Sequence, residues 1–236
     1  MSGEIAVIAG TAAIIGLVHT ILGPDHYLPF IAIAKARKWS FGKTALITFW
    51  CGVGHILGSV ILGFIGIAIG AAIFSIEAIE SFRGEIAAWF LIAFGFTYGV
   101  WGIHRALRSR QHEHQHLHDN GEVHSHTHSH VTDHTHVHNE KPGSVTPWVL
   151  FIIFVFGPCE PLIPLVMYPA AEHDMMSTAV VAGIFGVTTI ATMLVIVLAG
   201  HFGLSKISVP RLERYSHALA GMSIFVCGAA VKFLGL

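Results

Sequence analysis

The sequence predicts an all-α polytopic membrane protein, with six transmembrane helices in two inverted three-helix repeats whose first helices are broken at Gly-Pro. Composition is the first reason, because 53% of the 236 residues are hydrophobic and only 11% are charged, with a mean hydropathy of +0.67. Such a chain is too apolar for an ordinary soluble domain. Six long apolar runs and an uneven distribution of basic residues are the other two reasons. The formal net charge of −1 offers no basic surface for nucleic acid.

Six apolar segments are long enough to cross a bilayer, which takes about 20 residues. The first segment follows Met1–Glu4, which lacks the basic residues of a signal peptide, so we expect it to be retained as a membrane helix. The predicted segments are 5–22 (continuing after a break to about 34), 44–73, 85–104, 147–169, 177–201 and 214–235.

The distribution of Lys and Arg predicts how these segments are oriented. With six spans, the three connections on one side carry 11 of the 13 basic residues, and the other side has only Arg83 and Lys232. The positive-inside rule then places the first side in the cytoplasm, with both termini outside the plasma (inner) membrane. The basic residues of the cytoplasmic connections are Lys35, Arg37, Lys38, Lys43, Arg105, Arg108, Arg110, Lys141, Lys206, Arg211 and Arg214.

The two halves of the chain are similar around one short pattern. Residues 22–29 are Leu-Gly-Pro-Asp-His-Tyr-Leu-Pro, and residues 156–164 are Phe-Gly-Pro-Cys-Glu-Pro-Leu-Ile-Pro, with one additional residue. Each stretch lies in the first of three spans, so the two units would be antiparallel, as in many secondary transporters. Chance similarity between two Gly-Pro pairs is the alternative. The predicted units are a first repeat at 1–104, a cytoplasmic His-rich disordered loop at 105–146 and a second repeat at 147–236.

Two Gly-Pro pairs, Gly23-Pro24 and Gly157-Pro158, predict breaks in the membrane helices. Proline cannot donate a helical hydrogen bond and its ring clashes with the preceding turn, while glycine tolerates unusual backbone angles. Non-helical backbone at membrane depth is tolerated only where protein or a water-filled cavity covers it. Each break therefore predicts a cavity or a site.

Metal-binding side chains surround the first break. His19 and His26 would be about 10.5 Å apart along a regular helix, which is too far for one metal ion with bonds of about 2 Å. Unwinding at Gly23-Pro24 would bring His19 toward Asp25 and His26. Imidazoles with a carboxylate suit nickel, cobalt, copper or zinc better than magnesium or calcium. The alternative is that Asp25 only caps the helix after the break.

Three further residues are candidate ligands. His55 lies in a Gly-rich stretch that permits close helix approach, although it could instead be a hydrogen-bonded core residue. Glu160 follows the second break and would be costly in the membrane without a cation. Cys159 offers a thiolate or simply fills space, and we expect Cys51 and Cys227 to be small buried apolar residues. The predicted metal ligands are His19, Asp25, His26, His55, Cys159 and Glu160.

The stretch between Arg105 and Lys141 is a histidine tract. It has almost no large apolar residues, so it cannot form a core and is expected to lack structure without metal. Alternating histidines are typical of chelating tracts that bind several metal ions weakly. A solvated linker of biased composition is the alternative. The candidate chelating residues are His112, His114, His116, His118, His124, His126, His128, His130, His134, His136 and His138.

The chain resembles the NicO family of nickel/cobalt transporters at several of these residues. In that family a membrane helix carries a histidine followed a few residues on by Asp-His, as His19 is followed here by Asp25 and His26. The pair Gly54-His55 resembles the family's second-helix histidine, and the histidine tract is similar to that of bacterial nickel/cobalt efflux proteins. The resemblance extends over the six-span layout and implies Ni²⁺ or Co²⁺ as the transported ion.

These features predict secondary-active transport of a divalent transition-metal cation, nickel or cobalt first and Zn²⁺ third, with export favoured over uptake. Asp25, Glu160 and the histidines can exchange protons for metal, which would allow proton coupling. No Gly-x-x-x-x-Gly-Lys-Ser/Thr motif is present, which argues against direct use of ATP. We expect metal cations and the lipid bilayer as partners, with no prosthetic group, no nucleic acid and no enzymatic activity. The sequence leaves open whether the protein forms a homo-oligomer.

Three other functions compete with metal transport. A membrane thiol or electron-relay protein also places a cysteine beside a proline break in each repeat, but here Asp25 occupies one position and Cys159 the other. A two-thiol relay would therefore lack its second half. An exporter of anions should carry basic residues in its spans, where only Lys232 is found. An intramembrane metalloenzyme would need a nucleophile or a substrate cleft, and the sequence indicates neither.

Overall fold

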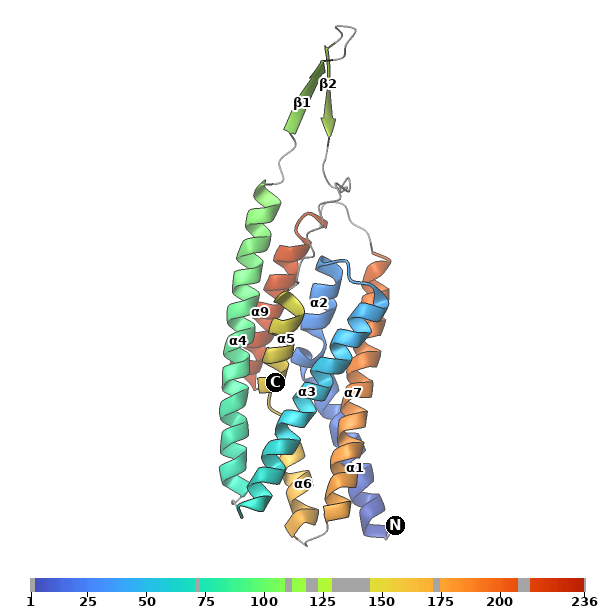
Figure 1. The fold of residues 1–236 in the computed structure, drawn as a ribbon, viewed down its shortest axis with the longest axis vertical. Helices are drawn as coiled ribbons and strands as arrows, with labels where there is room; N and C mark the ends of the chain where they lie inside the picture. Colours follow the sequence, from blue (N-terminus) through green and yellow to red (C-terminus); the bar gives the residue numbers. More distant parts are fainter. Residues whose placement is uncertain are drawn as a thin grey trace.

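The computed structural model describes residues 3–70, 73–108, 112–117, 123–128, 145–171, 175–207 and 213–235. Helices dominate these residues and form an elongated bundle, from one end of which a short hairpin projects (Figure 1). The elements are α1 (Gly3–Leu22), the 3₁₀ turn η1 (Pro24–His26), α2 (Leu28–Ala36), α3 (Phe41–Ala68), α4 (Ile73–Arg108), β1 (His112–Leu117), β2 (Val123–His128), α5 (Val145–Phe156), α6 (Leu162–Ala171), α7 (Met175–Ser205) and α9 (Ser216–Leu234).

Four of the described helices, α3, α4, α7 and α9, are long and apolar enough to cross a membrane. A fifth candidate is a bent pair, in which Ala6–Leu22 and Pro24–Ala36 meet at 83°. The protein is therefore a multi-pass membrane protein. The predicted six-span repeat is not confirmed, because the segment predicted at 147–169 consists of two shorter helices, α5 and α6. The described structure thus supports four spans, or five if the bent pair is one.

Helix α4 begins at Ile73, whereas the sequence predicted a span from residue 85. The added turns contain Glu77, Glu80 and Arg83, and such charges lower hydropathy without lowering helix propensity. Glu80 is fully buried and forms an ion pair with Arg83 one turn later. Arg83, which the sequence placed in an external connection, therefore lies inside the helical bundle.

Helices α4 and α9 pack against each other at backbone distance. A Cβ atom added to Gly221 of α9 would lie 2.2 Å from the backbone nitrogen of Gly99 on α4. A Cβ on Gly95 would similarly lie 2.3 Å from the backbone nitrogen of Phe225. Small residues at such a crossing allow the van der Waals contact that drives helix association in membranes. This pair of helices therefore depends on glycine.

We expect Gly221→Ala to destabilise the folded protein by about 1–3 kcal/mol, because its methyl group would overlap the α4 backbone. Gly183→Ala on α7 is the matched control, since a Cβ there meets nothing within 4 Å. Alanine at this helical position should be neutral or stabilising by up to about 1 kcal/mol. Unfolding titrations of both variants in detergent micelles measure the difference, and equal stabilities would contradict the close packing.

Basic side chains connect helices at the end of the bundle that carries β1 and β2 (Figure 1). The Lys35 ammonium donates to the carbonyls of Leu204 and Ile207, both at 2.8 Å. The Arg214 guanidinium donates to the Ala106 carbonyl at 2.7 Å. The last carbonyls of a helix have no partner within the helix, so these cations stabilise the ends of α7 and α4.

Strands β1 and β2 lie in the tract that the sequence predicted to lack structure. They pair in antiparallel register, with His112, His114 and His116 opposite His128, His126 and His124. Over these residues the structure differs from the prediction. The alternation of histidine with other residues has a period of two, which is the period of a strand, whereas the prediction considered only the lack of apolar residues.

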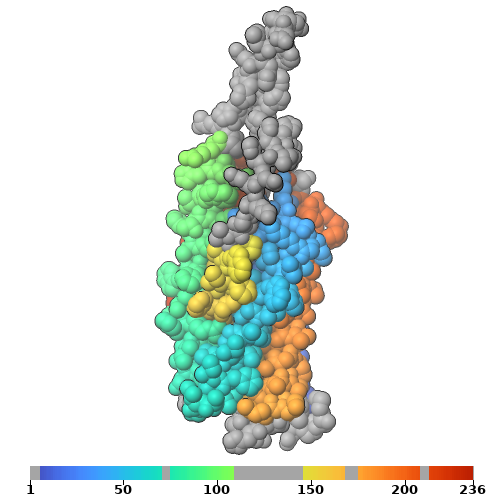
Figure 2. All heavy atoms as spheres, in the orientation of Figure 1, coloured from blue at the N-terminus to red at the C-terminus, as the bar shows by residue number. Residues whose placement is uncertain are grey.

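Two clusters of buried apolar side chains stabilise the bundle. The first includes Phe30 and Ile33 of α2 together with Phe154 of α5. The second includes Cys159 and Phe185 and lies between α1, α3, α6 and α7. In Figure 2 the atoms of α5 lie between those of α4 and α3 on the face shown.

Candidate functional site

The first break turns the chain sharply between α1 and α2. Helix α1 ends at Leu22, Gly23 is extended (φ −84°, ψ 97°), and Pro24–His26 form a single 3₁₀ turn before α2 begins. A Cβ atom on Gly23 would lie 2.6 Å from Nδ1 of His26 and 2.9 Å from Oδ1 of Asp25. The glycine therefore makes room for both side chains. The break predicted at Gly23-Pro24 is confirmed.

The second break separates α5 from α6 over residues 157–161. The Gly157 amide donates to the Phe154 carbonyl at 3.0 Å, and the Leu162 amide donates to the Cys159 carbonyl at 2.9 Å. These bonds close α5 and start α6 with tight turns, as expected at helix ends. The break predicted at Gly157-Pro158 is therefore present as well.

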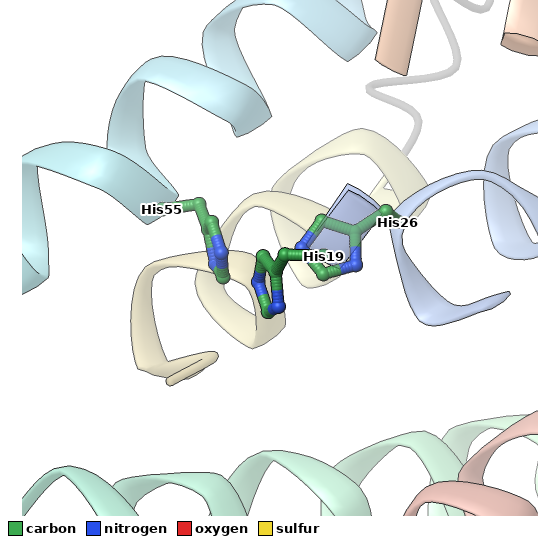
Figure 3. A group of neighbouring side chains, drawn as sticks. All are labelled: His19, His26 and His55. Carbon is green, nitrogen blue, oxygen red and sulfur yellow. The ribbon is translucent and has the colours of Figure 1, made fainter. Parts of the chain in front are cut away.

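Three histidines from separate parts of the chain meet beside the first break (Figure 3). His19 comes from the last turn of α1, His26 from η1 and His55 from the middle of α3. The ring centroids of His19 and His26 are 4.7 Å apart, and those of His26 and His55 are 5.0 Å apart. One ligand atom from each residue lies within 4.8 Å of the other two. Unwinding at Gly23-Pro24 thus brings together side chains that a continuous helix would separate.

Hydrogen bonds orient two of the three rings. Nδ1 of His26 lies 3.0 Å from Oδ1 of Asp25 and 3.2 Å from the Gly23 carbonyl, and Nδ1 of His55 lies 3.3 Å from the Phe154 carbonyl. All of these neighbours are acceptors, so Nδ1 carries the proton in both neutral rings and Nε2 has the free lone pair. Nε2 of His19, His26 and His55 is buried and has no hydrogen-bond partner among the described residues.

The cluster lies where the two breaks approach each other. A narrow cavity of about 10 Å³ borders it, lined by Asp25 after the first break, Gly157 of the second break and His55 between them. Side chains of α4 and α5, including Ala87 and Phe154, complete its wall. The site is therefore formed by both halves of the chain.

A buried ion pair holds the second break, and sequence analysis did not identify it. Glu80 accepts hydrogen bonds from the Cys159 amide and the Ser59 hydroxyl, both at 3.1 Å, and pairs with Arg83. Arg83 also donates to the Val155 carbonyl at 2.8 Å. The pair thus satisfies an amide and a carbonyl that the break leaves without helical partners. The spacing Glu-x-x-Arg, which places both on one helix face, was the available signal.

The remaining predicted ligands lie outside the histidine cluster. Asp25 contacts His26, whereas Cys159 lies in the second apolar cluster and Glu160 is exposed. Cys51 and Cys227 are buried, as predicted, and none of the three cysteines forms a disulfide. The structure therefore does not bring Cys159 or Glu160 to the three histidines.

The histidine tract is described only in part. Its residues in β1 and β2 are paired through the backbone register given above. The others lie outside the described residues, and metal chelation by the tract stays a prediction. The residues outside are His118, His130, His134, His136 and His138.

Comparison with known families gives one match, which extends over almost the whole chain. The family described as cytochrome c biogenesis protein transmembrane region matches residues 9–230. No curated protein and no solved structure matches the chain.

This match contradicts the resemblance to the NicO family. The prediction that the chain transports nickel or cobalt, whether by export or by uptake, was therefore also wrong. The resemblance depended on a few residues around His19, Asp25 and His26, whereas the match covers residues 9–230. A Gly-Pro break with polar neighbours occurs in more than one kind of membrane protein, so this local pattern could not identify the family.

Proposed function

Because this chain belongs to the family of cytochrome c biogenesis transmembrane regions, we propose that it is a membrane thiol and electron-relay protein. Its working thiol is that of Cys159, at the second break. The observation that carries the proposal is the family match, which includes both breaks and all three cysteines. The role in the cell is the supply of reducing equivalents for cytochrome c biogenesis.

The support at Cys159 comes from the polar groups around the second break. Glu80 is fully buried, and its carboxylate accepts the hydrogen bond from the Cys159 amide. Ionisable groups within a membrane protein are expensive and are usually functional. A pair that fixes the backbone of Cys159 suits a thiol whose position matters for reaction.

Because only one cysteine lies at the two breaks, Cys159 has to exchange disulfide bonds with partner proteins. The first break carries Asp25 where a two-thiol relay would have its second cysteine. The Cys159 thiolate attacks a partner disulfide, so that a mixed disulfide forms and the partner's other sulfur leaves as a thiolate. A thiol of a reduced dithiol donor then attacks the Cys159 sulfur, and the partner leaves with both of its thiols reduced. The donor's second thiol attacks the donor sulfur of the new mixed disulfide, which forms the donor's disulfide and releases the Cys159 thiolate. Two electrons pass from a dithiol donor to a disulfide acceptor in the complete cycle.

Access to Cys159 requires movement, because its side chain is fully buried. Ile8, Ile15 and Leu165 pack against its apolar cluster and also line a pocket of about 350 Å³ between α1 and α6. Displacement of α6 from α1 would widen this pocket toward the thiol.

The basic residues support a single orientation in the inner membrane. Lys35, Arg105 and Arg214 belong to the end of the bundle that carries the histidine hairpin, and cytoplasmic ends are rich in Lys and Arg. We place this end in the cytoplasm and both termini outside.

Substitution of Cys159 by serine tests the proposal. In cells that depend on this protein, Cys159→Ser should lower covalently attached haem c to the level of a deletion strain, measured by haem-peroxidase staining. Acid quenching followed by non-reducing electrophoresis should reveal a reductant-sensitive adduct on the intact protein, and none on the variant. Cys51→Ser and Cys227→Ser are matched controls, because both are buried cysteines within continuous helices, α3 and α9, whereas Cys159 lies in the second break. Full haem attachment in Cys159→Ser cells would rule out the relay.

A further inference from the structure

We propose that His19, His26 and His55 bind one divalent transition-metal ion, Zn²⁺ or Cu²⁺, through their three Nε2 atoms. The ion stays bound in this site and is not a transported substrate. The proposal does not depend on the chemistry of Cys159, because that residue lies outside the cluster.

The positions of the ligand atoms are the first argument. One ring nitrogen from each of the three histidines lies within 4.8 Å of the other two, and an ion with bonds of about 2.0–2.1 Å draws ligand nitrogens to about 3.5 Å separation. Small rotations of the imidazole rings close this difference. Each ring comes from a different element, and two are oriented by hydrogen bonds. The site therefore needs little rearrangement to accept an ion.

The unsatisfied nitrogens are the second argument. Nε2 of each of the three residues is buried and meets no hydrogen-bond partner in the described part of the chain. Buried polar atoms without partners are rare and costly. The Nδ1 partners keep the Nε2 lone pairs of His26 and His55 available. A cation bound by these nitrogens would give each of them the partner that it lacks.

Asp25 has a different role from the one that the sequence predicted for it. Its Oδ1 atom accepts from Nδ1 of His26, on the opposite side of the ring from Nε2. A carboxylate that pairs with a metal-binding histidine fixes the ring and raises its basicity. Its negative charge also offsets part of the charge of a divalent ion. Asp25 is thus a positioning residue.

The ligand set determines the class of ion. Imidazole nitrogens suit zinc and copper, whereas magnesium and calcium prefer oxygen ligands. Three histidines also leave a coordination position open for water or another ligand, as in catalytic zinc sites. The structure therefore favours a borderline metal with an incomplete protein shell.

Zinc retention by the full chain tests the site. The purified protein in detergent is loaded with Zn²⁺, washed briefly with EDTA to remove weakly bound ions from the histidine tract, and analysed by mass spectrometry of the metal. We expect about one zinc per chain in the intact protein and almost none in His26→Ala or His55→Ala. Asp25→Asn should weaken zinc binding about 10–100-fold. His104→Ala, at an exposed position of α4, should retain zinc like the intact protein.

Two further measurements separate loss of the site from loss of the fold. Circular dichroism and thermal unfolding without zinc should show that His55→Ala is folded, and His55→Gln serves if it is not. Loading with Cu²⁺ and the same EDTA wash, followed by electron paramagnetic resonance, should show nitrogen couplings in the intact protein that vanish in the variant. Equal zinc retention by the intact protein and His26→Ala, or none by either, would overturn the proposal. Haem attachment is not part of these measurements, so the relay can fail independently.

Discussion

Replacement of Glu80 by alanine is expected to destabilise the folded protein by about 3–5 kcal/mol, because it leaves a buried guanidinium without its counter-ion. The carboxylate is fully buried and Arg83 is only 16% exposed. The substitution also removes the acceptor of the Cys159 amide and of the Ser59 hydroxyl. Glu80→Ala therefore disturbs the second break as well as the ion pair. SDS-induced unfolding in micelles, followed by circular dichroism, measures the effect.

Two comparisons make this result specific. Glu85 also pairs with a lysine, Lys232, but its side chain is 56% exposed. Exposed ion pairs contribute little, so Glu85→Ala should change stability by less than about 1 kcal/mol. The double variant Glu80→Met, Arg83→Met removes both charges, and it should recover much of the stability that Glu80→Ala loses. If Glu80→Ala and Glu85→Ala have equal effects, the buried pair does not stabilise the second break.

Gly23→Ala is expected to destabilise the protein by about 1–3 kcal/mol, since a methyl group there would overlap two side chains of the site. The added carbon would lie 2.6 Å from Nδ1 of His26 and 2.9 Å from Oδ1 of Asp25. The backbone angles of Gly23 are open to alanine, so the effect is purely steric. The hydrogen bond between Asp25 and His26 should be lost, and zinc retention should fall with it.

A matched control for Gly23→Ala lies in the preceding helix, α1. A Cβ atom on Gly10 meets nothing within 4 Å, so Gly10→Ala should leave stability unchanged or raise it by up to about 1 kcal/mol. Thermal unfolding and zinc retention are measured for both variants. Normal stability and full zinc retention in Gly23→Ala would show that the site tolerates the added carbon, contrary to the geometry of the first break.

The sequence predicted the first break and its histidines well, because each has a local chemical signature. Gly23-Pro24 interrupts an apolar helix, and a histidine in such a helix is conspicuous. The position of His55 beside His26 was only one of two alternatives, since contact between residues so far apart depends on how α3 packs. The structure supplies that contact.

The second break shows where sequence reasoning fails. Glu160 lies two residues after Pro158, and the sequence therefore indicated it as a ligand, yet the tight turn leaves Glu160 exposed and Cys159 buried. The buried acid is Glu80, far away in the sequence, and its charge made the hydropathy pattern indicate a connection. A charged residue that is neutralised by a helical neighbour looks the same, in hydropathy, as one exposed to water.

The packing of α1 and α2 on α7 has a mechanical consequence. Both halves of the first broken helix lie against the continuous α7, and Lys35 fastens α2 to its end, while α5 and α6 both lie against the continuous α3. Each continuous helix thus supports both halves of a broken one, and the two groups of helices meet where α3 and α6 lie against α7. His19 and His26 belong to the group that contains α1 and α2, and His55 belongs to α3. A movement of α3 relative to α1 and α2 would therefore separate His55 from the other two imidazoles, and an ion bound by all three would oppose that movement.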